Sequence, residues 1–300
     1  MQDRESLYRR EAADFYKRLR QEVVRGNDCL TADENRALQA HYPIMMNSRR
    51  YPATLAETIY ASRRRHAVAA IRDTEMPVVL DAGCGFGSES FLFAMLGARV
   101  IALDVSAEQI AIAEKRKPYY EACLEKPLAI DFVVADLNRY VPQNTNLSLT
   151  WLASVLPIVR DKLGFMRRIR SATRPQGKVL VTDLNLANPM FQLAEWRRGH
   201  LGDGRLAWLK PMFDTFSRRP FNGARYPVSR DNVDGYSCFF NPRGLSRLLT
   251  SAEFKISLVD CAGFAPPQLF GDIAASAEAW IGGLPWINRF GYFYTVGAEK

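Results

Sequence analysis

Residues 78–87 read Val-Val-Leu-Asp-Ala-Gly-Cys-Gly-Phe-Gly, and this stretch carries the most informative pattern in the chain. Its continuous apolar start is typical of a strand that is buried on both faces of a sheet. Three alternating glycines follow, which allow a sharp turn and leave no Cβ between the main chain and a ligand. Residues 88–96 then read as a helix, whose first turn offers unpaired N–H groups to that ligand.

Outward from this stretch, short apolar runs alternate with helical segments. Such an alternation predicts a parallel sheet with helices on both faces, and ligands of such sheets bind beyond the carboxyl ends of the strands. The expected strands are Val78–Asp81, Val100–Asp104, Ile130–Ala135, Leu147–Leu152 and Lys178–Asp183.

The spacing of the glycines separates two families of nucleotide-binding turn. Dinucleotide-binding folds use Gly-x-Gly-x-x-Gly, whereas Gly83, Gly85 and Gly87 are evenly spaced and Asp81 precedes them by two residues. The pattern Asp-x-Gly-x-Gly-x-Gly resembles motif I of the class I S-adenosylmethionine-dependent methyltransferases. The resemblance covers roughly residues 76–185 and implies S-adenosylmethionine as the cofactor.

Two further strand ends agree with this resemblance. Asp104 ends the second strand 21 residues after Gly83, where a carboxylate can accept hydrogen bonds from both ribose hydroxyls. The alternative is that Asp104 caps the helix that begins near Ser106. In the family, an acid after the third strand meets the adenine amino group and the next backbone N–H meets a ring nitrogen, which Asp136 and Leu137 match. A turn aspartate on the surface is the alternative for Asp136.

The fourth strand departs from the family pattern, because no histidine follows it. Ala153 still lies where it can line the cofactor pocket. The cofactor-binding positions that the resemblance implies are Asp81, Gly83, Cys84, Gly85, Gly87, Asp104, Val105, Asp136, Leu137 and Ala153.

The helix after the fourth strand has one apolar stripe, which is expected to pack on the sheet. Leu163, Met166 and Ile169 form this stripe. The basic residues between them, Arg167, Arg168 and Arg170, are expected to face solvent.

The resemblance also implies the fold class: an α/β, Rossmann-like seven-stranded sheet of order 3-2-1-4-5-7-6, with the last strand antiparallel. Residues 251–254 read Ser-Ala-Glu-Phe where the family usually has Ala-Gly-Phe before strand six. Helix Pro242–Leu249, strand Lys255–Asp260 and the final run Phe290–Lys300 complete the expected sheet.

Four parts are expected along the chain: a helical N-terminal cap over residues 1–75, a cofactor-binding core over 76–185, an insertion over 186–240 and the rest of the core sheet over 241–300. The cap should contain helices at Tyr8–Arg25, Ala32–Ala40 and Thr54–Arg72. The insertion is rich in aromatic residues and arginines, which suit an apolar or planar substrate with an anionic group. We therefore expect the insertion, together with the N-terminal helices, to fold over the cofactor and make most contacts with the substrate.

Three residues are candidates for catalysis. Asp183 closes strand five, where the mouth of the site is expected, and Tyr51 lies near the expected cap. His66 shares a helix face with Leu55 and Ile59, so a structural role competes with a role as a base.

Composition narrows the class of protein further. The chain has 300 residues, is 48% hydrophobic and carries a net charge of +8 that is spread along its length. Its five cysteines lack a CxxC pair, which argues against a disulfide framework and a structural zinc site. No Asp/Glu/His cluster indicates a metal. The residues MQDRESLYRR lack the apolar core of a signal peptide and no window holds ~18 uncharged apolar residues, so we expect neither a signal peptide nor a membrane-spanning run. We expect a cytoplasmic protein with no transmembrane segment.

Three functions remain open at this stage. Methyl transfer to a small molecule leads. An RNA or other macromolecule methyltransferase is disfavoured, because residues 153–157 read Ala-Ser-Val-Leu-Pro where adenine-amino enzymes have Asn/Asp-Pro-Pro-Tyr/Phe, so nucleic acid is an unlikely partner. A non-catalytic S-adenosylmethionine-binding protein is the third reading. The acceptor atom and the oligomeric state are not fixed by the sequence.

Overall fold

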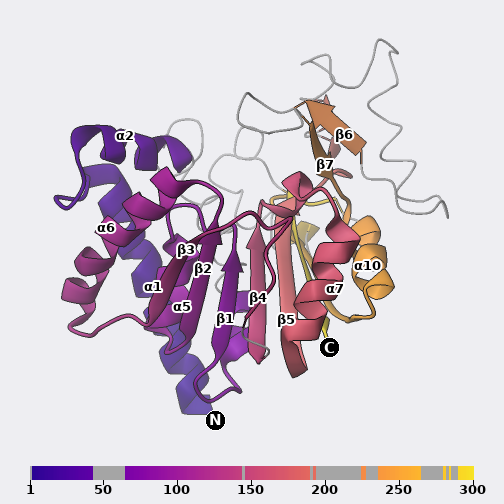
Figure 1. Cartoon of the computed structure of the whole chain (residues 1–300), viewed down its shortest axis with the longest axis horizontal. Coiled ribbons are helices and arrows are strands. Elements are labelled where there is room, and N and C mark those ends of the chain that lie inside the picture. The colour runs from indigo at the N-terminus through magenta and orange to yellow at the C-terminus, as the bar shows by residue number, and fades with distance from the viewer. Residues whose placement is uncertain are drawn as a thin grey trace.

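The structure is a computed structural model, shown in Figure 1. It describes residues 2–42, 65–143, 146–189, 192–193, 224–227, 236–264, 280–281, 284 and 290–300. Tyr51 and most of the 186–240 insertion lie outside the described residues.

A seven-stranded sheet forms the centre of the protein. The strand order is β3-β2-β1-β4-β5-β9-β8, and β9 runs antiparallel to both of its neighbours. Because a separate hairpin supplies β6 and β7, this is the expected order 3-2-1-4-5-7-6, and the expected fold class is confirmed. The strands are β1 (Val78–Ala82), β2 (Arg99–Asp104), β3 (Ile130–Val134), β4 (Leu147–Ala153), β5 (Thr173–Leu184), β8 (Lys255–Ala262) and β9 (Phe293–Glu299).

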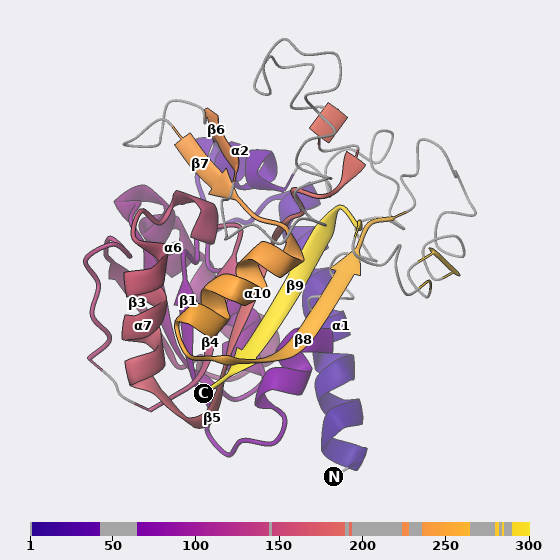
Figure 2. The same cartoon turned by 90° about the vertical axis from the view of Figure 1, so that its right-hand side faces the viewer.

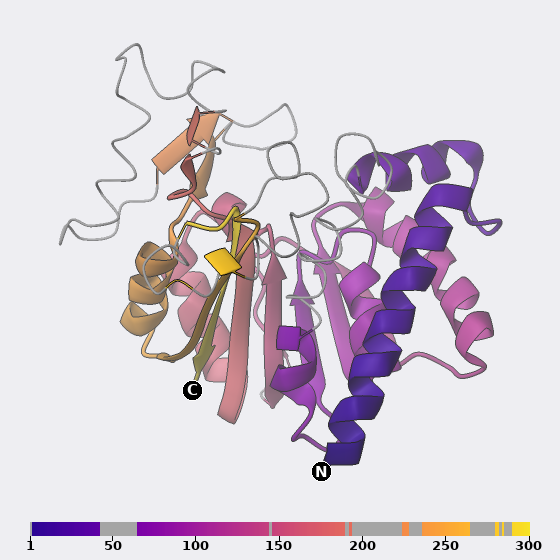
Figure 3. The ribbon, with the colours of Figure 1, turned by 180° about the vertical axis from the view of Figure 1, so that it is seen from behind.

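Helices cover both faces of the sheet, because its central strands are apolar on both sides. One face packs against α1 (Gln2–Arg25), α5 (Ser88–Met95), α6 (Ala107–Leu124) and the helical residues 65–71, as seen from behind in Figure 3. The other face packs against α7 (Lys162–Ala172) and α10 (Pro242–Ser251). Figure 2 shows the sheet between the two helical layers.

The sequence-based boundaries of β1, β2, β3 and β4 agree with the structure to within one residue at each end. Strand β5 begins at Thr173, five residues before the expected Lys178, because Thr173 pairs with Leu147 ahead of an irregularity in the β4–β5 register. Its polar start hides this extension from a search for apolar runs. Helix α1 begins at Gln2 instead of Tyr8, and of the expected helix Thr54–Arg72 only the end, residues 65–72, is described.

The turn before β8 has Glu253 at the position where the resemblance implies glycine. Glu253 has a φ of +65°, a left-handed conformation that glycine adopts more easily. The Phe254 N–H donates to the carbonyl of Leu249 and closes the end of α10. A non-glycine residue therefore adopts the left-handed conformation at the end of α10.

The described part of the insertion lies at the carboxyl edge of the parallel strands. The hairpin of β6 (Ala224–Pro227) and β7 (Tyr236–Phe239) stands beyond that edge in Figures 1 and 3. Strand β7 contacts the 3₁₀ helix η1 (Leu156–Ile158), which follows β4. The two ends of the insertion meet, because the Leu186 N–H donates to the Phe240 carbonyl at 2.9 Å.

Candidate cofactor-binding site

The glycine loop after β1 bends back over the end of β2. The N–H groups of Gly83 and Cys84 both donate to the carbonyl of Leu103 at 2.8 Å. Gly83, Gly85 and Gly87 all have positive φ values, of +79°, +53° and +80°. An L side chain rarely adopts this backbone, so the turn depends on glycine.

The three glycines face different surroundings. A Cβ at Gly87 would lie 3.1 Å from the Cβ of Ala113, so this glycine allows α5 and α6 to approach closely. A Cβ at Gly85 would lie 3.2 Å from Gln109 and 3.8 Å from the ring of His41. Gly83 is the one glycine of the loop that remains half-exposed.

Asp104 connects the glycine loop to the start of α6. Its Oδ2 accepts the Gly85 N–H and its Oδ1 accepts the Ser106 N–H, both at 2.9 Å. Ser106 is itself the N-cap of α6, because its hydroxyl accepts the Gln109 N–H. Asp104 is therefore not the helix cap, and each of its half-buried oxygens keeps a lone pair for a further donor.

The surroundings of Asp104 fit the ribose and base of a nucleoside. Val105, the next residue, is 65% exposed, which leaves an apolar surface beside a carboxylate. A turn with three glycines, a carboxylate with spare acceptor capacity and an exposed apolar side chain are groups that suit a nucleoside cofactor.

We predict that Asp104→Ala weakens S-adenosylmethionine binding by about 1–3 kcal/mol, because the ribose hydroxyls lose their acceptor. Isothermal titration measures the change. Asp131→Ala is the matched control, since Asp131 is an exposed aspartate on the neighbouring strand that pairs with Arg99. Equal affinities for the two variants would contradict the role of Asp104.

The loop after β3 presents the second expected carboxylate. Asp136 accepts hydrogen bonds from the backbone N–H of Asn138 at 2.9 Å and from its side-chain amide at 2.8 Å. The backbone bond and the side-chain bond hold the pKa of Asp136 below its usual value, against a smaller opposing effect of burial. Asp136 is thus a half-buried anionic acceptor beside the buried Leu137, as an exocyclic amine requires.

Arg168 supports this loop, which corrects the expectation that it faces solvent. It is half-buried, and its guanidinium donates to the carbonyls of Leu137, Asn138 and Tyr140. Arg170 also has partners, the carbonyl and carboxylate of Glu253. Of these three arginines, only Arg167 is exposed, and Arg168 and Arg170 are half-buried.

Asp81 lies beneath the glycine loop. Its carboxyl group is buried and accepts the Ser90 hydroxyl at 2.5 Å, which ties β1 to α5. Burial raises the pKa of Asp81 to about 8, despite the opposing effect of the Ser90 hydrogen bond. Cys84 is also buried, and burial raises the pKa of its thiol.

The raised pKa of Asp81 predicts a pH-dependent gain from Asp81→Asn. Between pH 3.8 and about 8 the unfolded chain has lost this proton and the folded protein keeps it, so wild-type stability falls as pH rises. The amide does not titrate. We expect the variant to gain roughly 3–4 kcal/mol over wild type between pH 5 and pH 8, measured by urea unfolding. A difference that is the same at both pH values would contradict this.

The end of β4 completes the carboxyl edge. Ala153 is half-buried there, and Ser154 has a φ of +57°, an uncommon value for a non-glycine residue. Its N–H donates to the Thr182 carbonyl at 2.9 Å, which holds the turn against β5. Val155 then packs against Gly83.

The two candidate catalytic residues that the structure describes, Asp183 and His66, are not brought together. Asp183 is buried at the carboxyl end of β5, and its Oδ1 accepts the Leu184 N–H at 2.7 Å. The ring nitrogen of His66 lies 2.7 Å from the carboxylate of Asp260 on β8. Strand β8 is four strands from β1, or roughly 19 Å at the usual strand spacing. Asp183 is thus nearer the site than His66.

The sequence analysis did not identify four residues that form a hydrogen-bonded network beside the glycine loop, Glu22, Tyr42, Ser88 and Arg116. A charged residue within the apolar stripe of a helix is the signal that could have identified Glu22 and Arg116. Glu22 follows Phe15 and Leu19 on α1, and Arg116 lies between Ile112 and Tyr120 on α6. Opposite charges on the buried faces of two helices indicate a buried ion pair.

The sequence predicts neither a metal site nor a membrane-spanning segment, and the described residues can be compared with both predictions. None of them form a group of three or more His, Cys, Asp or Glu side chains placed to hold a metal ion. Within the same part of the chain, no helix has the length and apolar character needed to cross a bilayer. None of the five cysteines forms a disulfide bond with another described residue.

Comparison with known proteins agrees with the geometry of this site. A family model for the methyltransferase domain matches residues 80–181. Ubiquinone biosynthesis O-methyltransferase from Cereibacter sphaeroides is 25% identical over 190 residues, which cover 60% of this chain and 71% of that protein. Phosphoethanolamine N-methyltransferase 3 from Arabidopsis thaliana is 27% identical over 127 residues, which cover 41% of this chain and only 25% of that protein.

A solved structure shows the same fold. It is a putative S-adenosylmethionine-dependent methyltransferase from Listeria monocytogenes, with a TM-score of 0.54 and 14% identity over 80% of this chain and 98% of that one. The chain therefore carries, at residues 80–181, a class I S-adenosylmethionine-dependent methyltransferase domain, and S-adenosylmethionine is its cofactor.

Proposed function

We propose that the protein transfers the methyl group of S-adenosylmethionine to a small molecule with an apolar or aromatic part and an anionic group. The observation that carries this proposal is the place of the insertion. Its two ends join at Leu186 and Phe240, and its hairpin contacts η1 at the carboxyl edge of the sheet. Ligands of such sheets bind at that edge.

The cofactor and the acceptor are assigned to different parts of the site in this proposal. Asp104, Asp136 and the glycine loop are our candidates for binding S-adenosylmethionine, which supplies a methyl group on a positively charged sulfur. The acceptor atom bonds to the methyl carbon as the carbon–sulfur bond breaks, and a neutral thioether leaves. An oxygen or nitrogen acceptor also releases a proton, and Asp183 is our candidate to take it, because it is a buried carboxyl group at the end of β5.

The two named relatives leave the acceptor atom open, since one is an O-methyltransferase and the other an N-methyltransferase. Both names refer to small molecules, in ubiquinone biosynthesis and in phosphoethanolamine methylation. The arginines of the insertion favour an acceptor that carries a carboxylate or phosphate.

Transfer of radiolabelled methyl groups tests the proposal. The panel pairs phenols and amines with and without an anionic group, and adds total RNA as a separate arm. We expect label on a small anionic aromatic compound and none on RNA. Label on RNA alone would replace the proposal with macromolecule methylation. Tight cofactor binding with no label in any arm, including a small-molecule extract, would favour a non-catalytic binder.

A further inference from the structure

A buried ion pair joins the N-terminal helix to the methyltransferase core. Glu22 on α1 and Arg116 on α6 are both fully buried. Arg116 Nε donates to Glu22 Oε1 at 2.8 Å, and Arg116 Nη2 donates to Glu22 Oε2 at 2.6 Å. The pair is therefore bidentate, which is the strongest geometry for arginine and a carboxylate.

Arg116 reaches beyond this pair to the glycine loop. Its Nη1 donates to the backbone carbonyl of Phe86, which lies between the second and third glycines, and to the Ser88 hydroxyl at 3.2 Å. Ser88 is the first residue of α5. The remaining Nη2 donor lies 3.4 Å from the Tyr120 hydroxyl, so every donor of the guanidinium has a partner.

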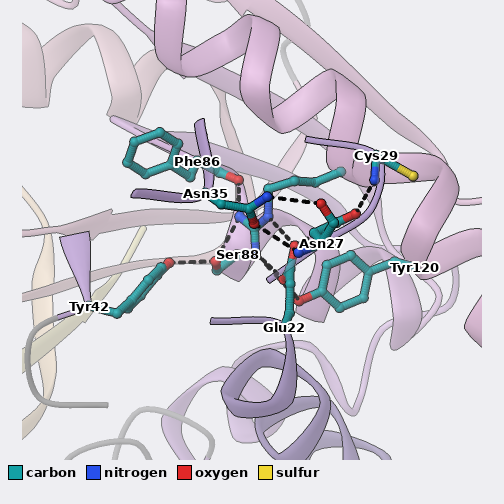
Figure 4. A network of polar contacts seen from close by, with 9 residues as sticks. Glu22, Asn27, Cys29, Asn35, Tyr42, Phe86, Ser88 and Tyr120 are labelled. Atoms are coloured by element: carbon teal, nitrogen blue, oxygen red, sulfur yellow. Dashed lines mark hydrogen bonds and ion pairs between the residues drawn. The ribbon is translucent and has the colours of Figure 1, made fainter. Parts of the chain in front are cut away.

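Other side chains fix both ends of this network, which Figure 4 shows from close by. The Tyr120 hydroxyl donates to Glu22 Oε2 at 2.5 Å, and the Asn27 side-chain amide donates to Glu22 Oε1 at 2.8 Å. The Tyr42 hydroxyl donates to the Ser88 hydroxyl at 2.5 Å. Glu22 thus has no freedom to turn away from Arg116, and Ser88 is held from two sides.

Stability alone is a poor reason for such a network. A buried ion pair loses so much hydration that apolar residues of similar volume usually stabilise a fold as well or better. Helices α1 and α6 already pack through Phe15 and Tyr120, whose ring centroids lie 5.4 Å apart. An apolar pair could join the helices, but it could not hold the carbonyl of Phe86 or the hydroxyl of Ser88.

We propose that Arg116, oriented by Glu22, is a positioning residue for S-adenosylmethionine binding. It fixes the glycine loop through the carbonyl of Phe86 and the first turn of α5 through the hydroxyl of Ser88. The proposal rests on the assignment of this loop as the cofactor site. It makes the N-terminal helix part of the cofactor-binding machinery, although α1 supplies no residue to the cofactor-binding positions expected from the sequence.

Electrostatics agree with a permanently charged pair. Burial alone would raise the pKa of Glu22, but its contacts with Arg116 and then Tyr120 hold that pKa below its usual value. The pKa of Arg116 is raised, because its contacts with Glu22 outweigh burial. Both groups therefore stay ionised at neutral pH, and the network does not act as a pH switch in that range.

The double variant Glu22→Gln/Arg116→Met separates positioning from stability. It removes both charges together, so neither is left buried without a partner, and the folded state is expected to survive. The anchors on Phe86 and Ser88 are lost all the same. We expect the dissociation constant for S-adenosylmethionine to rise about tenfold or more, measured by isothermal titration on protein shown to be folded by circular dichroism.

Arg116→Lys provides a second variant that keeps the charge opposite Glu22. A lysine cannot hold the carboxylate bidentately and reach the Phe86 carbonyl at the same time, so we expect a dissociation constant about fivefold above wild type. The control is Arg99→Met/Asp131→Asn, which removes an exposed pair on neighbouring strands and should leave affinity unchanged.

Wild-type affinity in both Arg116 variants, with melting temperatures either kept or lowered, would show that the network is merely structural and would overturn the proposal. If wild type itself failed to bind S-adenosylmethionine, the cofactor assignment would fall first, which is a different result. Weakened binding in both Arg116 variants with unchanged binding in the control supports the proposal.

Discussion

Valine in place of Gly83 is expected to lower the free energy of unfolding by about 3–5 kcal/mol. Gly83 has a φ of +79°, where an L residue costs roughly 1–2 kcal/mol and a β-branched one more. A Cβ there would also lie 2.4 Å from the Cγ2 and 2.7 Å from the Cβ of Val155. Overpacking of that kind costs typically 1–3 kcal/mol, because Val155 is itself buried.

Gly97→Val is the matched control for this prediction. Gly97 has a similar φ of +89°, but a Cβ there would meet nothing within 4 Å. Its substitution should therefore show the backbone cost alone. Urea unfolding of both variants measures the difference, and equal losses of stability would mean that Val155 yields to the new side chain without cost.

The strand and glycine turn at residues 78–87 are the part of the candidate site that the sequence reveals most directly. A strand buried on both faces is mostly apolar, and a tight turn beside the start of a helix needs glycine. Residues 78–87 therefore predict both the strand and the turn. Asp104 at the end of β2 and Asp136 in the loop after β3 follow the same logic, since the carboxyl edge of a parallel sheet is where polar side chains meet a ligand.

What could not be predicted depends on contacts between distant elements. The pairing of Glu22 with Arg116 requires that α1 and α6 lie side by side on one face of the sheet, and local propensity is silent on that. Arg168 appeared as one of three surface arginines, yet it holds the loop that carries Asp136 and Leu137. In both cases an arginine supports the backbone of the candidate cofactor site through contacts that local sequence does not reveal.

Replacing residues 190–235 with a short Gly/Ser linker is expected to abolish methyl transfer while cofactor affinity stays within about tenfold, or ~1.4 kcal/mol. The linker can close, because the ends of the insertion are already fastened outside this range. The Leu186 N–H donates to the Phe240 carbonyl, and the Asn188 amide donates to the Phe290 carbonyl at 2.7 Å.

The comparison of rate with affinity is what makes this deletion informative. The cofactor-binding candidates all lie at or before Ala153 in the sequence, so the insertion is not needed to hold S-adenosylmethionine by our assignment. A deletion variant that methylates its acceptor at the normal rate would show that the core or the N-terminal segment makes the acceptor site. One that loses cofactor affinity by far more than tenfold would place the insertion in the cofactor site itself. If the insertion after β5 recognises the acceptor, methyl transfer is lost and cofactor binding is kept. The reason is that much of the acceleration comes from bringing the acceptor to the methyl group in a pocket that excludes water.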